Sequence, residues 1–512
     1  MENHRNEFTF SRQNILGFVW TGLLVGLVSG TVVSLFRLSI EKIFERVVEI
    51  YHQSHHNHWL LLLIIFVSLI FAFIIGFLVK SEPDIKGSGI PHVEGELKGM
   101  LHPNWWSVLW KKFIAGVLAI SMGFMLGREG PSIQLGSMSA KGLSKWLKSS
   151  RVEKRVLIAS GAAAGLSAAF NAPIAGLLFV VEEVYHHFSR LVWISALVAS
   201  LVANFISLNI FGLHPVLGFP NHLTSLGLYQ YWILPVMGIF LGLLGYYYEV
   251  IILRIQWVYQ KLEGIFRLPQ YLNVIYLVFA ILPIGYYAPQ LLGGGNGLII
   301  SMAGKSPTLL VALTYFIIRF IWSMLCYGSG LPGGIFLPIL TLGSLAGLCF
   351  GLLFENLHLI SHDLIPLFIV LGMSGYFGAI SKAPLTGMIL VTEMVGDMRQ
   401  LMSIGVVTLF AYIIMDFLKG EPIYEAMLSK MSLSKPKELI EPTLIELTVS
   451  DKIAGKKVRD LHLPHNALIT TQMSGKHSEL VSGNTILRSG ETIFLVVNEP
   501  DIAKIRAYFM ET

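Results

Sequence analysis

Long apolar stretches separated by short polar connections cover the chain between residues 15 and 418. The first stretch follows a polar start over residues 1–14 and predicts a helix from 15 to about 50. Further apolar helices are expected at 60–79, 105–125, 191–211, 229 to about 255, 271–287, 309–326, 364–376, 384–393 and 402–418. Because about 20 apolar residues cross the hydrocarbon core of a bilayer, the pattern predicts an all-α polytopic membrane domain over residues 15–435.

The pattern changes after residue 435, where charge rises and the long apolar runs stop. Short segments at 444–449, 467–473 and 492–497 alternate apolar and polar residues, as half-buried strands do. Residues 455–464 predict a short amphipathic helix, and residues 489–491 predict a turn before the last strand. We therefore expect a small α/β domain over residues 436–512.

Composition supports the membrane assignment. The chain is 54% hydrophobic and 13% charged, with a mean hydropathy of +0.65, whereas soluble proteins carry about 25% charged residues. Many apolar stretches follow the first one, so it is interpreted as a membrane span and not as a cleaved signal peptide. The two cysteines, Cys326 and Cys349, lie in apolar runs and predict buried thiols.

The net charge of +5 is modest and gives no support for a nucleic-acid partner. Basic residues gather in the connection 145–155 and near 430–437, and the positive-inside rule places both segments, and both termini, in the cytoplasm. Histidines 52, 55, 56 and 58 form a cluster after the first helix, but they lack a helical carboxylate partner, so we expect no metal site there.

A charged sequence interrupts the apolar pattern at Gly127-Arg128-Glu129-Gly130-Pro131. Charge at membrane depth is costly unless it is paired or faces water, so this segment is a candidate functional site. Glycine allows close approach of the backbone to a ligand, and proline is accepted in the first turn of a helix. The segment therefore predicts a helix start inside the membrane, whose free amide groups can bind an anion.

Two similar helix starts occur elsewhere in the membrane part. One is the segment from Gly87 through Ser88 and Gly89 to Pro91, and the other runs from Gly334 to Pro338. Each helix start contributes roughly half a positive charge, which binds a small anion without holding it too tightly for turnover.

Glu129 differs from the other residues of these helix starts. Its carboxylate would occupy the anion's place when ionised and leave when protonated. Glu129 is therefore predicted to be a gate that competes with the anion and carries a proton.

The membrane part contains an internal repeat. The residues Gly127, Pro131, Leu135-Gly136-Ser137 match Gly334, Pro338, Leu342-Gly343-Ser344 at an offset of 334 − 127 = 207. The residues Ala172-Pro173, Gly176 and Glu182 match Ala383-Pro384, Gly387 and Glu393 at an offset of 384 − 173 = 211. Helix starts repeated in both halves point to a transport site at the repeat interface. The pattern alone does not tell whether the halves, about 15–215 and 225–430, are inverted.

The three helix starts resemble, in order, the signature motifs of the CLC family of chloride channels and proton/chloride antiporters, and the resemblance covers about residues 15–430. It implies a homodimer in the membrane lipid, most simply a bacterial plasma membrane, with one pore per subunit and two inverted halves with broken and re-entrant helices. It also implies chloride and protons as transported ions, with no cofactor and no metal.

The resemblance further implies roles for individual residues. Ser88, Gly89, Tyr424 and the backbone amides of Ile335 and Phe336 are expected to bind chloride, and Glu129 is the expected external gate. The supporting helix-start residues are Gly87, Pro91, Gly127, Arg128, Gly130, Pro131, Gly334 and Pro338. Glu183, the second residue of the Glu182–Glu183 pair, matches the inner glutamate that relays protons in antiporters and that channels of the family generally lack. An interfacial position for this pair is the alternative.

Proton-coupled chloride exchange is therefore the expected function. A passive chloride channel of the same fold and a transporter of nitrate or fluoride are the alternatives. Ser88 stands where nitrate-preferring members carry proline, and the chain keeps both the Glu-Gly-Pro sequence and the tyrosine that fluoride exporters lack. An enzyme is not expected, because no nucleophile–base pair stands beside the glutamates.

The tail after residue 435 resembles the C-terminal half of the regulator-of-potassium-conductance module, also called TrkA-C. The resemblance implies a cytoplasmic, dimerising regulatory domain that can bind a small ligand. An assembly domain without a ligand is the alternative, and a cyclic dinucleotide is one ligand class to be considered.

Overall fold

The computed structural model describes residues 2–184, 190–219, 223–431, 442–450, 453–461, 463, 467–474, 477–498, 505 and 508–509. The chain forms two compact units, residues 1–431 and 432–512. Within the described part of the first unit, nine helical segments are long and apolar enough to cross a membrane. The chain is therefore an integral membrane protein, and the predicted fold class, an all-α polytopic membrane domain with a small domain containing a sheet, is confirmed.

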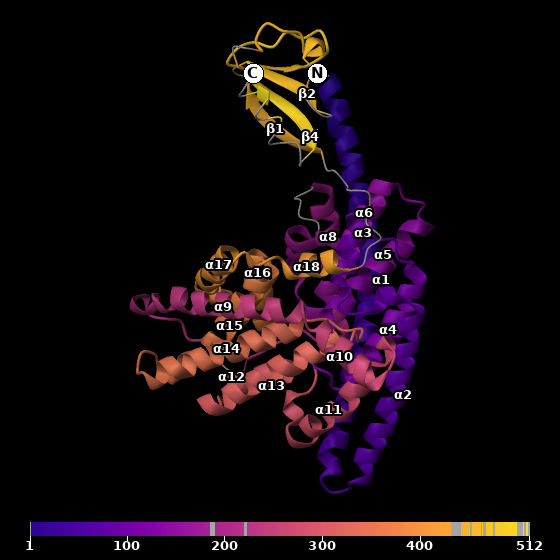
Figure 1. The fold of residues 1–512 in the computed structure, drawn as a ribbon, viewed down its shortest axis with the longest axis vertical. Coiled ribbons are helices and arrows are strands. Elements are labelled where there is room, and N and C mark those ends of the chain that lie inside the picture. The colour runs from indigo at the N-terminus through magenta and orange to yellow at the C-terminus, as the bar shows by residue number, and fades with distance from the viewer. Residues whose placement is uncertain are drawn as a thin grey trace. The chain divides into compact units, whose positions relative to one another are not determined.

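The first half of the membrane unit, drawn from indigo to magenta in Figure 1, contains eight α-helices among its described residues. They are α1 (Glu2–Ser54), α2 (Trp59–Ser81), α3 (Ile90–Leu97), α4 (Trp105–Ser121), α5 (Glu129–Trp146), α6 (Arg151–Phe170), α7 (Pro173–Phe179) and α8 (Arg190–Phe211). Helix α1 begins well before the predicted residue 15, because residues 2–14 contain neither glycine nor proline and nothing stops the helix. A π-helical turn, η2 (Val180–Val184), directly follows α7.

The second half, drawn from magenta to orange, contains ten described α-helices. They are α9 (Ile233–Ile252), α10 (Gln256–Phe266), α11 (Val274–Tyr287), α12 (Asn296–Gly304), α13 (Leu309–Gly328), α14 (Phe336–Asn356), α15 (Ile365–Ser381), α16 (Pro384–Val395), α17 (Leu401–Phe417) and α18 (Ile423–Lys430). Hydropathy did not predict α10, α12 and α18, because they have 11, 9 and 8 residues and are shorter than a membrane span.

Small residues allow α1 to pack closely on α8. A side-chain carbon added at Gly22 would come within 2.9 Å of the Ser195 carbonyl oxygen. One added at Gly26 would come within 2.7 Å of the Ala199 carbonyl oxygen. The four-residue spacing of these glycines therefore serves backbone contact between the helices.

The predicted repeat has a physical counterpart at the centre of the membrane unit. Gly127 and Gly334 form an isolated antiparallel bridge, in which each amide donates to the other's carbonyl oxygen at 2.7 Å. The bridge stands directly before α5 and α14, so the two repeated helix starts meet head to head. The two halves are inverted relative to each other, as the resemblance implied.

The second unit contains a four-stranded antiparallel sheet in the order β1-β4-β2-β3. Its strands are β1 (Pro442–Thr448), β2 (Leu468–Ser474), β3 (His477–Leu480) and β4 (Thr492–Asn498), so the three predicted strands are confirmed and β3 was not foreseen. The predicted turn at residues 489–491 contains Gly490 with φ +76°.

The prediction of an amphipathic helix over 455–464 is wrong for the residues that the structure describes there. They contain one 3₁₀ turn, Val458–Asp460. The backbone amides of Gly455, Val458 and Arg459 donate instead to carbonyl oxygens of Leu487, Thr485 and Gly483. These bonds draw the segment into an extended pairing, which competes with the helical bonds that the apolar spacing favoured.

Candidate functional site: a cluster of helix starts

The starts of α5 and α14 are held together by the Gly127–Gly334 bridge. Glu129 and Phe336 are the first residues of the two helices, and both are fully buried. A side-chain carbon added at Gly334 would lie 3.1 Å from the Gly130 amide nitrogen, and one added at Gly127 would lie 3.1 Å from the Leu337 amide nitrogen. Glycine is therefore required here by the close approach of the two backbones.

The start of α3 joins these two helix starts. Gly89, with φ +90°, is the N-cap of α3, and Pro91 is its second residue. Ser88 contacts Gly130 so closely that a side-chain carbon at Gly130 would clash with the Ser88 hydroxyl and come within 2.7 Å of its carbonyl oxygen. The structure therefore brings together the three predicted helix starts, although they lie up to about 250 residues apart in the sequence.

Tyr424 lies on α18 and is fully buried. Its ring contacts Phe179 at a centroid distance of 6.3 Å, and Phe179 contacts Phe336 at 5.9 Å. Phe336 also packs against Phe170 and Phe377, which makes an aromatic wall beside the start of α14.

Buried hydroxyl groups in this cluster have no hydrogen-bond partner among the described residues. They are the hydroxyls of Ser88 and Tyr424. The buried Glu129 carboxylate lies beside its own amide and the amide of Leu337, at the starts of α5 and α14. An unpaired buried polar group costs about 1–3 kcal/mol, so such a concentration is typical of a site that binds something polar. Two hydroxyl donors and the amides of three helix starts suit an anion.

Glu183 lies on η2, which packs against α3, α6 and α7, and its residue is 3% exposed. A π-helical turn is rare and frequently marks a functional site. Glu183 is thus on a different element from the helix starts, but η2 contacts α3, the helix that directly follows Ser88 and Gly89.

The neighbouring Glu182 has a different environment. It accepts bonds from the amides of Leu385 and Thr386 at 3.2 and 2.7 Å, at the start of α16. Glu393 of α16 accepts bonds from the amides of Ile174 and Ala175 at 3.2 and 2.8 Å, at the start of α7.

A glutamate of each repeat therefore caps the start of a helix in the other repeat. The sequence contained the signal for this arrangement, the offset of 393 − 182 = 211. The repeated glutamates were noted, but their exchange of helix starts was not foreseen.

Lys98 connects α3, the helix that follows Ser88, with α18, the helix that carries Tyr424. Its ammonium lies 2.8 Å from both Glu94 of α3 and Glu425 of α18. Burial lowers the pKa of Lys98, but the hydrogen bonds and charges of Glu425 and Glu94 outweigh burial and raise this pKa above its usual value. The ammonium stays charged and fixes the start of α18, where Tyr424 lies, against α3. Sequence reasoning missed Lys98.

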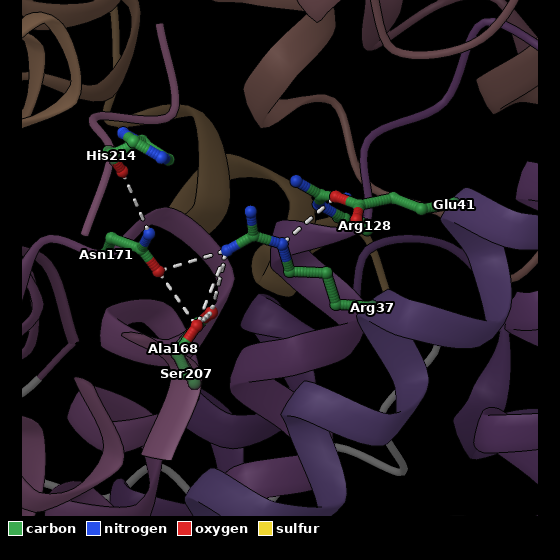
Figure 2. A network of polar contacts seen from close by, with 7 residues as sticks. All are labelled: Arg37, Glu41, Arg128, Ala168, Asn171, Ser207 and His214. Atoms are coloured by element: carbon green, nitrogen blue, oxygen red, sulfur yellow. Dashed lines mark hydrogen bonds and ion pairs between the residues drawn. The ribbon is translucent and has the colours of Figure 1, made fainter. Parts of the chain in front are cut away.

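Arg128 belongs to a polar network that Figure 2 shows. Glu41 of α1 forms ion pairs with both Arg128 at 2.5 Å and Arg37 at 3.0 Å. Arg37 also donates to Asn171 at 3.1 Å, and Asn171 donates to the His214 carbonyl oxygen at 3.3 Å. The residue before Glu129 is therefore connected to α1 and to the end of α6.

The four histidines near residue 55 do not gather around a ligand. Within the described parts of the chain, no group of three or more histidine, cysteine, aspartate or glutamate residues could hold a metal ion. Both cysteines are free, with Cys326 buried and Cys349 partly buried.

Comparisons with known proteins identify the family of the chain. Residues 71–416 match the family model for voltage-gated chloride channels, and residues 443–510 match the TrkA-C domain model. The H(+)/Cl(-) exchange transporter ClcA of Salmonella arizonae is 34% identical over 422 residues, which cover 80% of this chain and 88% of that protein. The Vibrio cholerae protein of the same name is 34% identical over 445 residues, 83% and 92% of the two chains.

Among solved structures, a slow cyanobacterial Cl⁻/H⁺ antiporter is similar, with a TM-score of 0.74 and 27% identity, over 82% of this chain and 98% of that one. These relatives are transporters rather than enzymes. The chain therefore belongs to the voltage-gated chloride channel family, also called CLC, and carries a TrkA-C domain after its membrane part.

Proposed function

We propose that this protein exchanges chloride for protons across the membrane. The observation that carries the proposal is the meeting of three helix starts. There the buried hydroxyls of Ser88 and Tyr424 have no partner among the described residues, and the buried Glu129 carboxyl lies beside the amides of the helix starts. The names of the similar transporters and their identity of 34% support proton-coupled chloride exchange over other anion chemistry.

Chloride would lie between the hydroxyls of Ser88 and Tyr424, with amides of Gly89, Ile335 and Phe336 as further donors. Helix dipoles supply partial positive charge, so the anion is attracted without a fixed full charge at its side. This balance suits a transported ion, which must bind and also leave.

Glu129 would act as the gate. It stands at the first position of α5, where an ionised carboxylate is stabilised by the helix start. Protonation removes that stabilisation, the side chain leaves, and an anion takes its place. Competition between carboxylate and chloride couples proton uptake to chloride movement.

Glu183 would relay the proton between Glu129 and the other side of the membrane. Its burial on η2 separates it from bulk water, and Glu182 is already engaged in capping α16. The adjacent glutamates therefore divide their functions: one holds two repeats together and the other is free to carry a proton.

Several coarser assignments follow from the same proposal. The active form is a homodimer in a bacterial plasma membrane, with both termini in the cytoplasm. No cofactor is needed, and the transmembrane domain runs over about residues 15–435. The tail over 436–512 is a regulatory domain, whose small ligand, if it binds one, is tested by thermal-shift screening of the full chain. Part of the basic segment near 430–437, used for orientation, lies outside the described residues.

The experiment is reconstitution of the full chain into liposomes with simultaneous recording of chloride and pH. An imposed chloride gradient is expected to drive protons against their own gradient. A passive channel would move chloride without uphill proton movement, and that result would reject the exchange mechanism. Replacing chloride with nitrate or fluoride in the same assay tests the identity of the anion.

A further inference from the structure

The repeat relates two buried cations that the proposed mechanism does not use. Lys112 of α4 and Arg319 of α13 are both fully buried, and their offset, 319 − 112 = 207, equals that of the helix starts. Lys112 donates to the carbonyl oxygens of Ile85 and Gly87 at 2.8 and 2.7 Å. Both cations therefore lie on the helix before a bridged helix start, α5 or α14.

Arg319 makes the corresponding bonds in the second half. It donates to the carbonyl oxygens of Leu291, Gly293 and Gly294 at 2.8, 2.9 and 2.5 Å. The repeat offset pairs Ser88 with Gly295 (88 + 207 = 295), so α12 corresponds to α3. In both halves a buried cation fixes the carbonyls of a glycine-containing loop, and the next residues begin a short helix whose first amides have no helical partners.

The start of α12 opens into a cavity of about 530 Å³. The cavity is lined by the glycine-rich loop with Asn296, by Leu337, and by Glu41, Glu45, His52 and Arg128. Asn296 is the first residue of α12, so its side chain stands beside the free amides of that helix start. Because Glu41, Glu45 and His52 lie in the last third of α1, the cavity faces outside when the N-terminus is cytoplasmic.

Arg128 provides an independent indication of a ligand. The residue is only 5% exposed, and its Nε and Nη2 atoms have no hydrogen-bond partner within the described parts of the chain. Arg128 and Arg37 share the carboxylate of Glu41 and both also interact with Glu129. The two arginines and Glu41 leave a net charge of 2 − 1 = +1 when Glu129 is protonated, and an ionised Glu129 cancels it. Glu45 and His52, the other titratable lining groups, are exposed.

We infer that the start of α12 and Arg128 form a second binding site for a small inorganic anion, outside the gate. The inference rests on the proposed function, because chloride would bind at this site before it reaches the position of Glu129. A cavity of this volume accommodates an anion with part of its hydration shell, since a water molecule occupies about 30 Å³. The second anion is therefore held more weakly than the one between Ser88 and Tyr424, which suits rapid entry and release.

The test uses bromide, whose anomalous scattering identifies an anion in crystals of the full chain. A bromide peak is expected beside the α12 start and Arg128, in addition to a peak beside Ser88 and Tyr424. Asn296→Asp places a negative charge at the start of α12 and should remove the outer peak. The matched control is Asn209→Asp, the same substitution at an exposed position of α8, which should retain both peaks.

Flux measurements give a second readout that does not depend on crystals of the variant. In liposomes, Asn296→Asp should raise the external chloride concentration for half-maximal exchange about fivefold or more, while the internal value and the proton coupling stay unchanged. A central bromide peak without an outer one, with Asn296→Asp matching Asn209→Asp in flux, overturns the inference alone. Absence of the central peak as well would contradict the proposed function itself.

Discussion

The two halves of the membrane unit have corresponding backbone arrangements, but they carry different residues where their helix starts meet. In both halves, a helix with a buried cation precedes the Gly127–Gly334 bridge, and a long helix begins directly after the bridge. The first half places Glu129 at the start of its helix, and the second half places Phe336 there. The first repeat thus presents an ionisable group. The second presents Phe336, which packs against Phe170 and Phe179 of the first repeat and Phe377 of the second.

Residues that have the same role in both repeats support the fold, whereas residues that differ between the repeats are the proposed transport residues. Glu182 and Glu393 cap each other's helices, and Lys112 and Arg319 hold corresponding loops, so these pairs maintain the fold. The two repeats differ where Glu129 corresponds to Phe336 and where Ser88 corresponds to Gly295. Breaking a symmetric pair is expected to affect stability, whereas breaking an asymmetric one should affect transport.

The largest effect is expected at Glu129. Glu129→Gln removes the proton-accepting carboxyl group at the start of α5, so proton movement should fall by on the order of 100-fold or more while chloride movement persists. The measurement is simultaneous chloride and proton flux in liposomes. Glu49→Gln, a half-exposed glutamate near the end of α1, is the control and should behave like the unchanged protein. Persistent proton coupling in Glu129→Gln would reject the gate.

A somewhat smaller effect is expected at Glu183. Glu183→Gln keeps the shape of the side chain on η2 but removes its proton affinity, so coupled proton movement should fall about tenfold or more while chloride flux remains. Glu182→Gln on the same turn is the informative comparison, because it should retain coupling. Loss of chloride flux together with proton flux in Glu183→Gln would make this residue structural.

The reciprocal caps test the symmetric side of the comparison. Glu182→Gln and Glu393→Gln each weaken two backbone bonds at the start of a helix, so each should lower the free energy of unfolding by about 1–2 kcal/mol. Thermal unfolding in detergent measures both variants. A large decrease for one and none for the other would show that the repeat symmetry does not extend to these helices.

Sequence reasoning predicted the helix starts because glycine, proline and charge stand out from an apolar background. Gly127 and Gly334 were paired by their offset alone, and the structure joins them by two hydrogen bonds. The roles of Ser88, Tyr424, Glu129 and Glu183 as transport residues remain predictions, since a family motif locates a residue without measuring what it does.

The remaining features depend on contacts that hydropathy does not encode. The short helices α12 and α18 are too short to produce a membrane signal, although they carry the second anion site and Tyr424. In the tail, apolar spacing suggested a helix where backbone pairing with residues 483–487 prevails. Lys112 and Arg319 follow the repeat offset, but neither lies within a glycine–proline motif, so only the carbonyl groups around them reveal their importance.

The smallest effect is expected at Lys98, which links α3 of the first half to α18 of the second half. Lys98→Ala removes ion pairs to Glu94 and Glu425. Because Glu425 is half exposed, the pair that links α18 to α3 is worth about 0.5–1 kcal/mol. The start of α18 would then be less well fixed against α3, and the chloride concentration for half-maximal exchange should rise about two- to fivefold. Lys145→Ala, at the end of α5, is the control. An unchanged chloride dependence in Lys98→Ala would mean that packing alone holds Tyr424 in place. The difference between the halves would then lie in the residues that bind the anion and not in the ion pairs that position those residues.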